Sequence, residues 1–278
     1  MTNKSSAVPE DALEDIAYFA RSKNRVRLLV LLASGSYTRR ELGEITGVAK
    51  TTIGRILNEF SERGWSERTD DGGYTATPIG RQVVVEFMPL VEAMSAINQL
   101  DETVAWFQAT ENPIGMGQLT DATVVRPDPA DPMAPVNAYM GDLRTASEFH
   151  CLVGVAPPES FEKAMRDGVV ERGMRAEHVI NESEYTYLLQ YPNRLTRWRE
   201  YIEAGANVYC YDGAVPCNVM IFDETVYIAN TQSEYGEPYT VIESHNDAVL
   251  SWGHELIDTY RNDAKRLDGR SFRDGLAH

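Results

Sequence analysis

The sequence is short of the residues that mark several classes of protein. Its 278 residues include only three cysteines, Cys151, Cys210 and Cys217, whose spacing fits neither a disulfide framework nor a zinc motif. No run of 18 or more apolar residues is present, and residues 1–6 lack the apolar core of a signal peptide. These absences predict a cytoplasmic protein with reduced thiols and no membrane partner.

Lysine is also scarce. Only five of the 26 basic residues are lysines, and 42 acidic residues bring the formal net charge to -16. Acid excess with few lysines resembles the proteins of extreme halophiles, and it then reflects the solvent rather than the partner. The excess is uneven: residues 1–85 hold 12 basic and 11 acidic residues, whereas residues 86–278 hold 14 and 31. The first part can therefore approach a polyanion.

The first 85 residues have the helix signals of a DNA-binding module. Apolar periodicity predicts three helices, over residues 9–20, 24–33 and 39–46. Thr38 and Glu41 form a capping box for the third, Gly47 ends it, and a further helix begins at Ala49. One face of this further helix is apolar and is expected to be buried: Ile53, Ile56, Leu57 and Phe60.

The opposite face of that helix carries polar side chains suited to base edges and phosphates. Glu59 and Glu62 are expected on its exposed side, away from phosphates, so only the first two turns are predicted to dock. With the preceding helix and the segment after Gly64, the predicted DNA-binding set is Arg39, Arg40, Lys50, Thr51, Thr52, Arg55, Asn58, Arg68 and Tyr74.

Two short extended runs follow, on either side of Asp-Gly-Gly at residues 71–73, and predict a β-hairpin. Helices followed by a hairpin make a winged helix. The order resembles bacterial and archaeal winged-helix repressors, and "YTATPIGRQV" (residues 74–83) is similar to their wing-to-helix junction. The resemblance implies a winged helix-turn-helix domain over residues 1–85 that binds double-stranded DNA. The alternative is a winged helix that binds protein.

Residues 86–119 are predicted to form a linker and dimerisation helix. Apolar residues spaced 4, 3, 4 and 3 apart form a short coiled-coil pattern: Val83, Phe87, Leu90, Met94 and Ile97. Pro89 should kink or divide this helix. The pattern predicts a homodimer that places two wings on a palindromic operator. The alternative is a helix packed on its own chain.

Residues 120–278 alternate predicted strands and helices. This alternation predicts an α/β domain with a largely parallel sheet, an antiparallel hairpin over residues 217–230, an edge strand at residues 240–243 and a final helix at residues 246–267. The expected fold class is thus a two-domain α+β or α/β protein: a winged helix-turn-helix, a long linker helix and an α/β sensor-like domain.

Two segments carry a second resemblance, "NVYCYDGAVPCNVMIFDETVYIA" (residues 207–229) and "SHNDAVLSWGHELIDTYRNDAKRL" (residues 244–267). Their plan resembles the effector domain of the archaeal methanogenesis-regulatory-protein type, related to the phospholipase D-like domain of archaeal sugar-responsive regulators. Phospholipase D enzymes use a His-x-Lys motif, and no Lys follows His150, His178 or His245 at that spacing. The resemblance therefore implies a domain that is not an enzyme.

Polar residues near the predicted strand ends favour a ligand site instead. In open α/β sheets the ligand crevice lies beyond the carboxyl ends of the strands. The candidates suit a hydroxyl-rich or small polar metabolite: Asn181, Tyr185, Tyr211, Asp212 and Asn230. The alternative is that the tyrosines complete the core rim or a dimer face.

Cofactor and metal sites are not expected. Cys210 and Cys217 are predicted on adjacent strands, but two thiols and a distant histidine fall short of a tetrahedral metal set. Redox sensing by the three cysteines competes with their use as small buried apolar residues.

The sequence as a whole predicts a homodimeric transcription regulator whose C-terminal domain senses a small-molecule effector. Two alternatives stay open. One is a phospholipase D-like enzyme with a DNA-targeting module, and the other is a ligand-free interaction scaffold.

Overall fold

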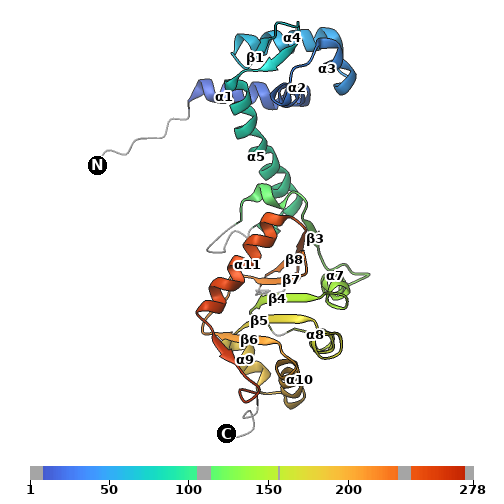
Figure 1. Ribbon diagram of the computed structural model, residues 1–278, viewed down its shortest axis with the longest axis vertical. Helices are drawn as coiled ribbons and strands as arrows, with labels where there is room; N and C mark the ends of the chain where they lie inside the picture. Colours follow the sequence, from blue (N-terminus) through green and yellow to red (C-terminus); the bar gives the residue numbers. More distant parts are fainter. Residues whose placement is uncertain (1–8, 105–113, 156, 231–238, 273–278) are drawn as a thin grey trace, which may run out of the picture. The chain divides into compact units, whose positions relative to one another are not determined.

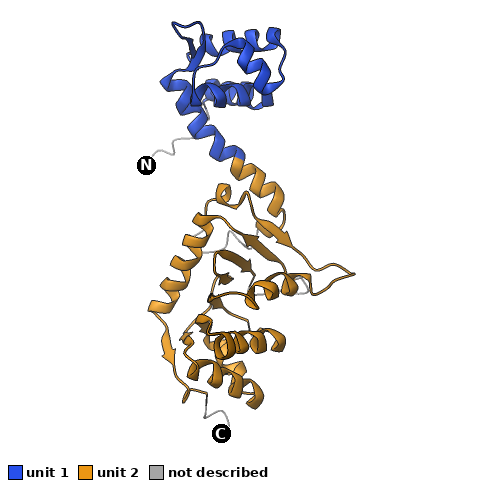
Figure 2. Cartoon of the chain, turned by 45° about the vertical axis from the view of Figure 1, so that its right-hand side comes forward, with its two compact units in different colours: residues 1–91 blue, residues 92–278 orange. Residues whose placement is uncertain are grey.

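The computed structural model describes residues 9–104, 114–155, 157–230 and 239–272. The chain divides into two compact units, unit 1 (Met1–Val91) and unit 2 (Glu92–His278), which we describe separately (Figure 2). The predicted two-domain fold class is confirmed: helices and a small hairpin form unit 1, and a mixed sheet with helices forms unit 2.

Unit 1 is a winged helix. Its elements are α1 (Glu10–Ala20), α2 (Lys23–Ser34), α3 (Arg39–Thr46), α4 (Lys50–Glu62), β1 (Ser66–Arg68), β2 (Tyr74–Ala76) and the first part of α5 (Pro78–Leu100). The capping box is present, since Glu41 N–H donates to the Thr38 hydroxyl and Thr38 N–H donates to the Glu41 carboxylate. Gly47 ends α3 at a φ of 71°, a left-handed conformation that favours glycine.

The core of unit 1 holds α4 in place. The four apolar residues predicted on its inner face are all at most 1 % exposed. They pack with Phe19 and Trp65, whose rings lie 5.7 Å apart in an edge-to-face contact. The polar face of α4 is therefore turned outward by burial of the opposite face.

Gly80 allows the start of α5 to approach β1. A Cβ atom at this position would lie 1.9 Å from the backbone oxygen of Trp65. Thr77 N–H donates to the same oxygen at 3.0 Å, and the Thr77 hydroxyl donates to the Gly64 carbonyl at 2.6 Å. These contacts join the wing to α5.

Helix α5 runs without division from Pro78 to Leu100, with Pro89 inside it. Of the two outcomes expected for Pro89, a kink or a division, the structure excludes the division. Among the described residues, α5 is the one helix that could cross a membrane by length and composition. Glu86 and Glu92 lie within it, and most of its surface is exposed.

Unit 2 is built on a mixed sheet in the order β10-β6-β5-β4-β7-β8-β9-β3 (Figure 1). The strands are β3 (Thr123–Val125), β4 (Glu148–Val153), β5 (Arg175–Asn181), β6 (Asn207–Tyr211), β7 (Asn218–Phe222), β8 (Thr225–Ala229), β9 (Val241–Ser244) and β10 (Lys265–Leu267). The helical elements are η1 (Met116–Leu119), α7 (Ala134–Leu143), α8 (Glu159–Arg172), α9 (Glu182–Leu188), α10 (Pro192–Glu203) and α11 (Asp247–Asn262).

The sheet is less parallel than predicted. Only the pairs β4–β5 and β5–β6 are parallel, and the other pairings are antiparallel. The segment expected at the sheet edge, β9, pairs on both sides, and β3 takes the edge. The last helix ends at Asn262, and Lys265–Leu267 returns as edge strand β10 beside β6.

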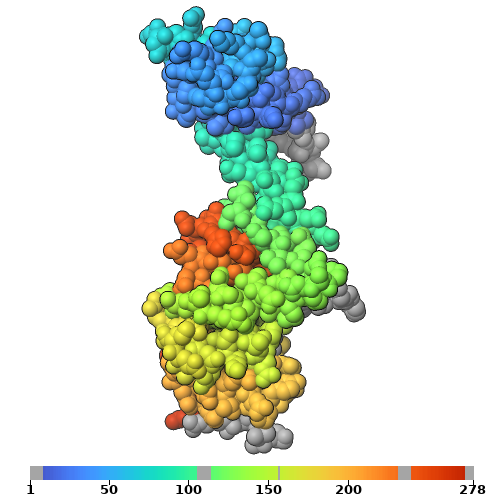
Figure 3. All heavy atoms as spheres, turned by 90° about the vertical axis from the view of Figure 1, so that its right-hand side faces the viewer, coloured from blue at the N-terminus to red at the C-terminus, as the bar shows by residue number. Residues whose placement is uncertain are grey.

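Each face of the sheet buries its own hydrophobic core. Helices α7, α8 and α10 lie on one face, and α11 lies on the other (Figure 1). The first core includes Phe149, Phe161 and Trp198, and the second includes Val219 and Ile257. Figure 3 looks onto the side of unit 2 that carries α7, α8 and α10. The two faces therefore offer separate places for a ligand.

Candidate DNA-binding surface and ligand site

The first nine residues of α4, Lys50 to Asn58, present unpaired polar groups. Lys50, Thr51 and Asn58 are exposed and Thr52 is half-buried. Within the described residues, no hydrogen bond or ion pair involves any of these four side chains. A base edge or phosphate would therefore meet donors that need not first break a contact within the protein.

Arg55 lies on the same face but is paired. Its guanidinium donates to Glu59 at 2.6 Å across one helical turn, and its side chain is 59 % exposed. The expectation that Glu59 faces solvent is wrong. Its carboxylate accepts from the Tyr18 hydroxyl at 2.8 Å and lies 3.5 Å from Arg25, so it faces α1 and α2.

Glu59 thus links α4 to the rest of unit 1. Burial, together with the Glu59 carboxylate, raises the pKa of Tyr18 to about 12, so this phenol stays a donor. The guanidinium of Arg25 stacks 3.8 Å above the Tyr18 ring. The same carboxylate holds Arg55, which fixes where the arginine emerges from the helix.

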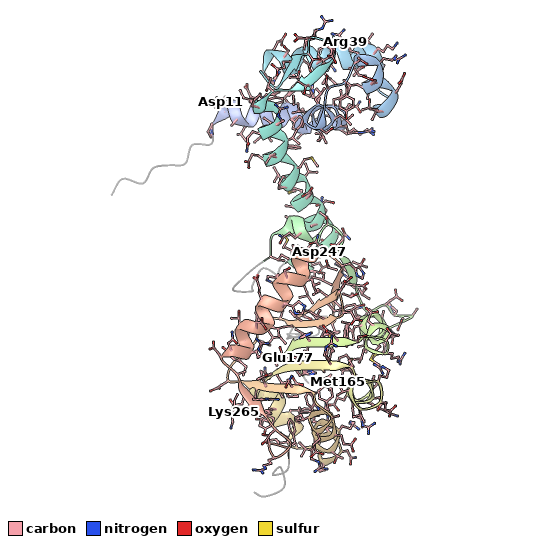
Figure 4. All side chains as sticks on the ribbon, in the orientation of Figure 1. Asp11, Arg39, Met165, Glu177, Asp247 and Lys265 are labelled. Atoms are coloured by element: carbon pink, nitrogen blue, oxygen red, sulfur yellow. The ribbon has the colours of Figure 1, made fainter. Side chains whose placement is uncertain are left out.

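Arg39 joins α3 to the wing. Figure 4 labels Arg39 on unit 1. Its guanidinium lies 5.3 Å from the centre of the Tyr74 ring, and its terminal nitrogen would be 3.7 Å from a Cβ atom at Gly54. Tyr74 pairs with Arg68 across the hairpin, and Arg68 is exposed. The wing and α4 therefore form one continuous surface around Arg39.

Two details limit the positive character of this surface. Arg40 pairs with Glu44 at 3.6 Å, with both side chains largely exposed. Asp70 and Asp71 sit exposed at the wing tip, where the Asp71 carboxylate accepts from Thr69. The wing therefore presents negative charge at its tip and one basic residue, Arg68, on its strand.

The apolar pattern predicted as a dimer seam on α5 is split. Val83 and Phe87 pack into the core of unit 1, with the Phe87 ring 4.6 Å from Phe19. Leu90, Met94 and Ile97 are 49 %, 49 % and 37 % exposed. The first two residues thus serve the fold, and the last three leave an apolar surface without cover.

The five predicted ligand residues lie in different surroundings. Tyr185 and Asp212 line a polar pocket of about 440 Å³ beside Lys265 and Arg270. The Tyr185 hydroxyl donates to the Ser271 carbonyl at 2.6 Å. Figure 4 labels Lys265 on β10, the strand that sequence reasoning missed.

The other three residues lie elsewhere. Tyr211 makes an edge-to-face contact with Tyr260 and packs against the core beneath α11. The Asn181 side chain caps α9, accepting from Glu184 N–H at 2.8 Å. The Asn230 carbonyl accepts from the Asn218 amide at 3.0 Å. The predicted set does not converge on one pocket within the described residues.

The two strand histidines point to opposite faces of the sheet. His150 lies near Glu177 at 4.0 Å and its ring is 5.1 Å from that of His254, beneath α11. His178 packs edge-on against Phe149 in the other core. The two side chains therefore do not meet at one site.

The cysteines are kept as thiols by burial. Cys151 and Cys217 are buried, and burial raises the pKa of all three thiols, that of Cys217 to about 12. The expectation that Cys210 and Cys217 lie on adjacent strands is wrong, because β5 and β4 separate β6 from β7. Among the described residues, no group of three or more possible ligands could hold a metal ion.

Comparison with known families gives the two units separate matches. Residues 13–99 match the HVO_A0261 N-terminal domain. Residues 132–263 match the middle domain of the methanogenesis regulatory protein FilR1. The chain therefore combines an amino-terminal domain of the HVO_A0261 type with a domain of the type found in the methanogenesis regulatory protein FilR1. No curated protein matches it.

Solved structures similar to this regulator are distant. TrmBL2, an archaeal chromatin protein described as showing a novel mode of DNA binding, is 16 % identical, with a TM-score of 0.42. That match covers 93 % of this chain and 100 % of TrmBL2. Nuc, a phospholipase D family member from Salmonella typhimurium, is 14 % identical with a TM-score of 0.41, covering 53 % of this chain and 97 % of its own.

Proposed function

We propose that this regulator is a sequence-specific DNA-binding protein of the cytoplasm of a halophilic archaeon, with no catalytic activity. The supporting observation is the exposed polar face of α4, on which Lys50, Thr51 and Asn58 have no partner within the described residues. The near balance of charge in residues 1–85 agrees with this role, because it spares this part the repulsion that the rest of the chain would exert on DNA.

The proposed contacts divide by chemistry. Thr51, Thr52, Arg55 and Asn58 reach base edges, and Arg55 suits guanine because its guanidinium can donate two parallel hydrogen bonds. Lys50, Arg39, Arg40 and Arg68 contact phosphates, and Tyr74 holds Arg39 in place from the wing. Arg55 exchanges its carboxylate partner for a base, so base recognition competes with the Glu59 ion pair.

The proposed active form is a homodimer on a palindromic operator. Leu90, Met94 and Ile97 lie within about 60° of one another around α5 at 100° per residue, and all are exposed. A second copy of the same stripe would cover them, since apolar helix faces pack on one another. Two half-sites also supply affinity that one winged helix rarely gives.

The proposed dimer is tested by sedimentation of the full chain. Leu90→Asp combined with Met94→Asp should raise the dimer dissociation constant at least tenfold, because two charges would enter an apolar seam. Val85→Asp is the matched control, since Val85 is 60 % exposed but lies on the opposite side of α5. Equal dissociation constants for the two variants would contradict this seam.

The C-terminal unit is proposed to sense a small-molecule effector and to shift the dimer between DNA-binding states. Such coupling requires an effector whose affinity differs between those states. A gel-shift titration in molar salt, with and without effector, measures how far the effector changes the affinity for DNA.

A further inference from the structure

Unit 2 contains a cavity that none of the predicted ligand residues lines. It lies beyond the carboxyl end of β4, between the loops that lead into α7 and α8, on the face covered by those helices. Its volume is about 370 Å³, within the range of roughly 300–1,000 Å³ that holds small molecules. Tyr139, Phe161 and Met220 supply much of its wall.

Among the described residues, no charged side chain lines this cavity. The described lining contains no Asp, Glu, Lys or Arg, although such residues make up 24 % of the chain. The carboxylate of Glu162, next to the lining residue Phe161, is 1 % exposed and is already paired: it accepts from Arg194 at 2.7 Å and from Arg197 at 3.2 Å. A charged ligand would therefore lose its hydration without gaining a partner.

Prolines restrict the backbone around the cavity. Five of the lining residues are prolines: Pro127, Pro132, Pro135, Pro157 and Pro158. Their fixed φ angles lower the entropy that the walls lose on binding. Two asparagines hold the adjoining strand end, since Asn218 accepts from Gly154 N–H at 2.8 Å and Asn181 donates to the Gly154 carbonyl at 3.4 Å.

His178 gives the cavity a polar ring nitrogen, in addition to the amide of Asn218. It lines the cavity although it is 1 % exposed, and its Nδ1 lies 3.4 Å from the Tyr201 hydroxyl. Burial lowers the pKa of His178 to about 3, so the ring is neutral at physiological pH. Its Nε2 has no hydrogen-bond partner among the described residues, and a neutral ring nitrogen suits a hydroxyl, carbonyl or amide.

We infer that the effector of the C-terminal unit is an uncharged, largely apolar small molecule that binds in this cavity and meets the His178 ring with one polar group. The assignment rests on the proposed function, in which this unit senses a ligand. It replaces the polar, hydroxyl-rich metabolite expected from the strand ends with a different chemical class.

The test uses the full chain and the uncharged fluorescent probe N-phenyl-1-naphthylamine. The probe should bind saturably, 1-octanol should displace it, and octanoate should displace it at least tenfold less well. Glucose should leave it bound. Equal displacement by octanol and octanoate, or displacement by glucose, overturns the inference without any variant.

Variants locate the probe. Val136→Trp fills the cavity from α7, where Val136 is half-buried, and should weaken probe binding at least tenfold. Val136→Ser leaves the cavity open and should bind within about threefold of the wild type. Ile79→Asp alters a separate apolar groove in unit 1 and should leave binding unchanged. Loss of binding in Ile79→Asp, or retention in Val136→Trp, overturns the assignment.

A parallel gel shift keeps the two proposals distinguishable. DNA binding with no probe binding overturns the cavity assignment alone. Probe binding at the Val136 site with no DNA binding overturns the regulator proposal. The cavity then remains a ligand site of this chain, with a function other than transcription regulation.

Discussion

Residues 1–85 and residues 86–278 differ in their balance of acidic and basic residues. The first part holds 12 basic and 11 acidic residues, and the second holds 14 and 31. The α4 face in the first part keeps polar groups unpaired, whereas arginines in unit 2 pair with buried carboxylates such as Glu162. The difference indicates that acidic residues are abundant in residues 86–278, where they favour solvation, and fewer in residues 1–85, where a polyanion is proposed to bind.

The largest expected effect is a loss of stability in unit 1 that leaves unit 2 unchanged. Gly80→Ala should destabilise unit 1 by about 3 kcal/mol, because the new methyl group would overlap the Trp65 carbonyl. Amides of unit 2 should keep their protection. Hydrogen exchange measured by mass spectrometry reports the protection of unit 1 and of unit 2 separately. Gly43→Ala is the control, since its Cβ would meet its nearest atom at 3.6 Å; equal losses in both variants would contradict the close approach.

Arg55→Ala tests whether the α4 face of unit 1 binds DNA. Loss of one guanidinium from the base-reading face should weaken specific binding by about 2 kcal/mol and relax the preference at one base position. Arg175→Ala is the control from unit 2, since this arginine is 76 % exposed and pairs with Glu148. A gel-shift series with single-base operator variants measures both. Equal affinity of the two variants would remove Arg55 from the recognition set.

Glu184 tests the buried charges of unit 2. Its two carboxylate oxygens are buried without a hydrogen-bond partner among the described residues, and burial raises the pKa of this carboxyl well above 4.5. A raised folded pKa means that the native state keeps a proton that the unfolded chain loses, so this contribution to stability is complete below pH 4.5 and declines as pH rises.

Glu184→Gln should therefore be more stable than the wild type at pH 8 by at least about 1 kcal/mol, and the gain should shrink towards pH 4.5. Urea unfolding at several pH values measures the difference. Glu182→Gln, an exposed carboxyl on the same helix, should stay within about 0.5 kcal/mol at every pH. A gain that does not depend on pH would contradict a proton held by Glu184.

The smallest effect concerns the acidic wing tip. Asp70→Asn removes one exposed negative charge near the proposed phosphate path and should strengthen DNA binding roughly twofold at 0.15 M salt. The gain should vanish in molar salt, where the screening length falls to about 3 Å. Glu255→Gln, on the exposed side of α11, should change nothing at either salt concentration. A gain that persists in molar salt would contradict a screened charge effect.

The sequence predicts local features of this molecule well, because local signals decide them. Thr38, Glu41 and Gly47 give the third helix its start and end, and the structure confirms both. The apolar face of α4 is likewise buried as its periodicity predicts. Where residues within a few positions determine the outcome, pattern and structure agree.

Long-range pairing is where the expectations fail. Strand direction depends on which strands become neighbours. The strands from β7 to β3 and the pair β10–β6 are antiparallel, and β5 and β4 lie between β6 and β7, which separates Cys210 from Cys217. β10 has three residues and no periodicity to reveal it. Glu59 has a sequence position typical of an exposed residue, and only the approach of Tyr18 and Arg25 from other helices holds it inward.

The five residues predicted for the ligand site do not share one pocket for the same reason. Prolines at residues 127, 132 and 157 look like loop residues in sequence, and only the folded sheet brings them around His178. The signal available in the sequence was two groups of prolines, at residues 127–135 after β3 and at residues 157–158 after β4, and neither group shows that the other lies beside it in the fold.

The central claim is that the amino-terminal half of α4 reads DNA. Selection of bound duplexes from a random library in molar salt, followed by sequencing, tests it most directly. The wild type should enrich an inverted repeat with half-sites about one helical turn apart, and a Lys50→Ala, Thr51→Ala, Arg55→Ala variant should enrich none. Enrichment of the same repeat by that variant, or of no repeat by the wild type, would contradict the account.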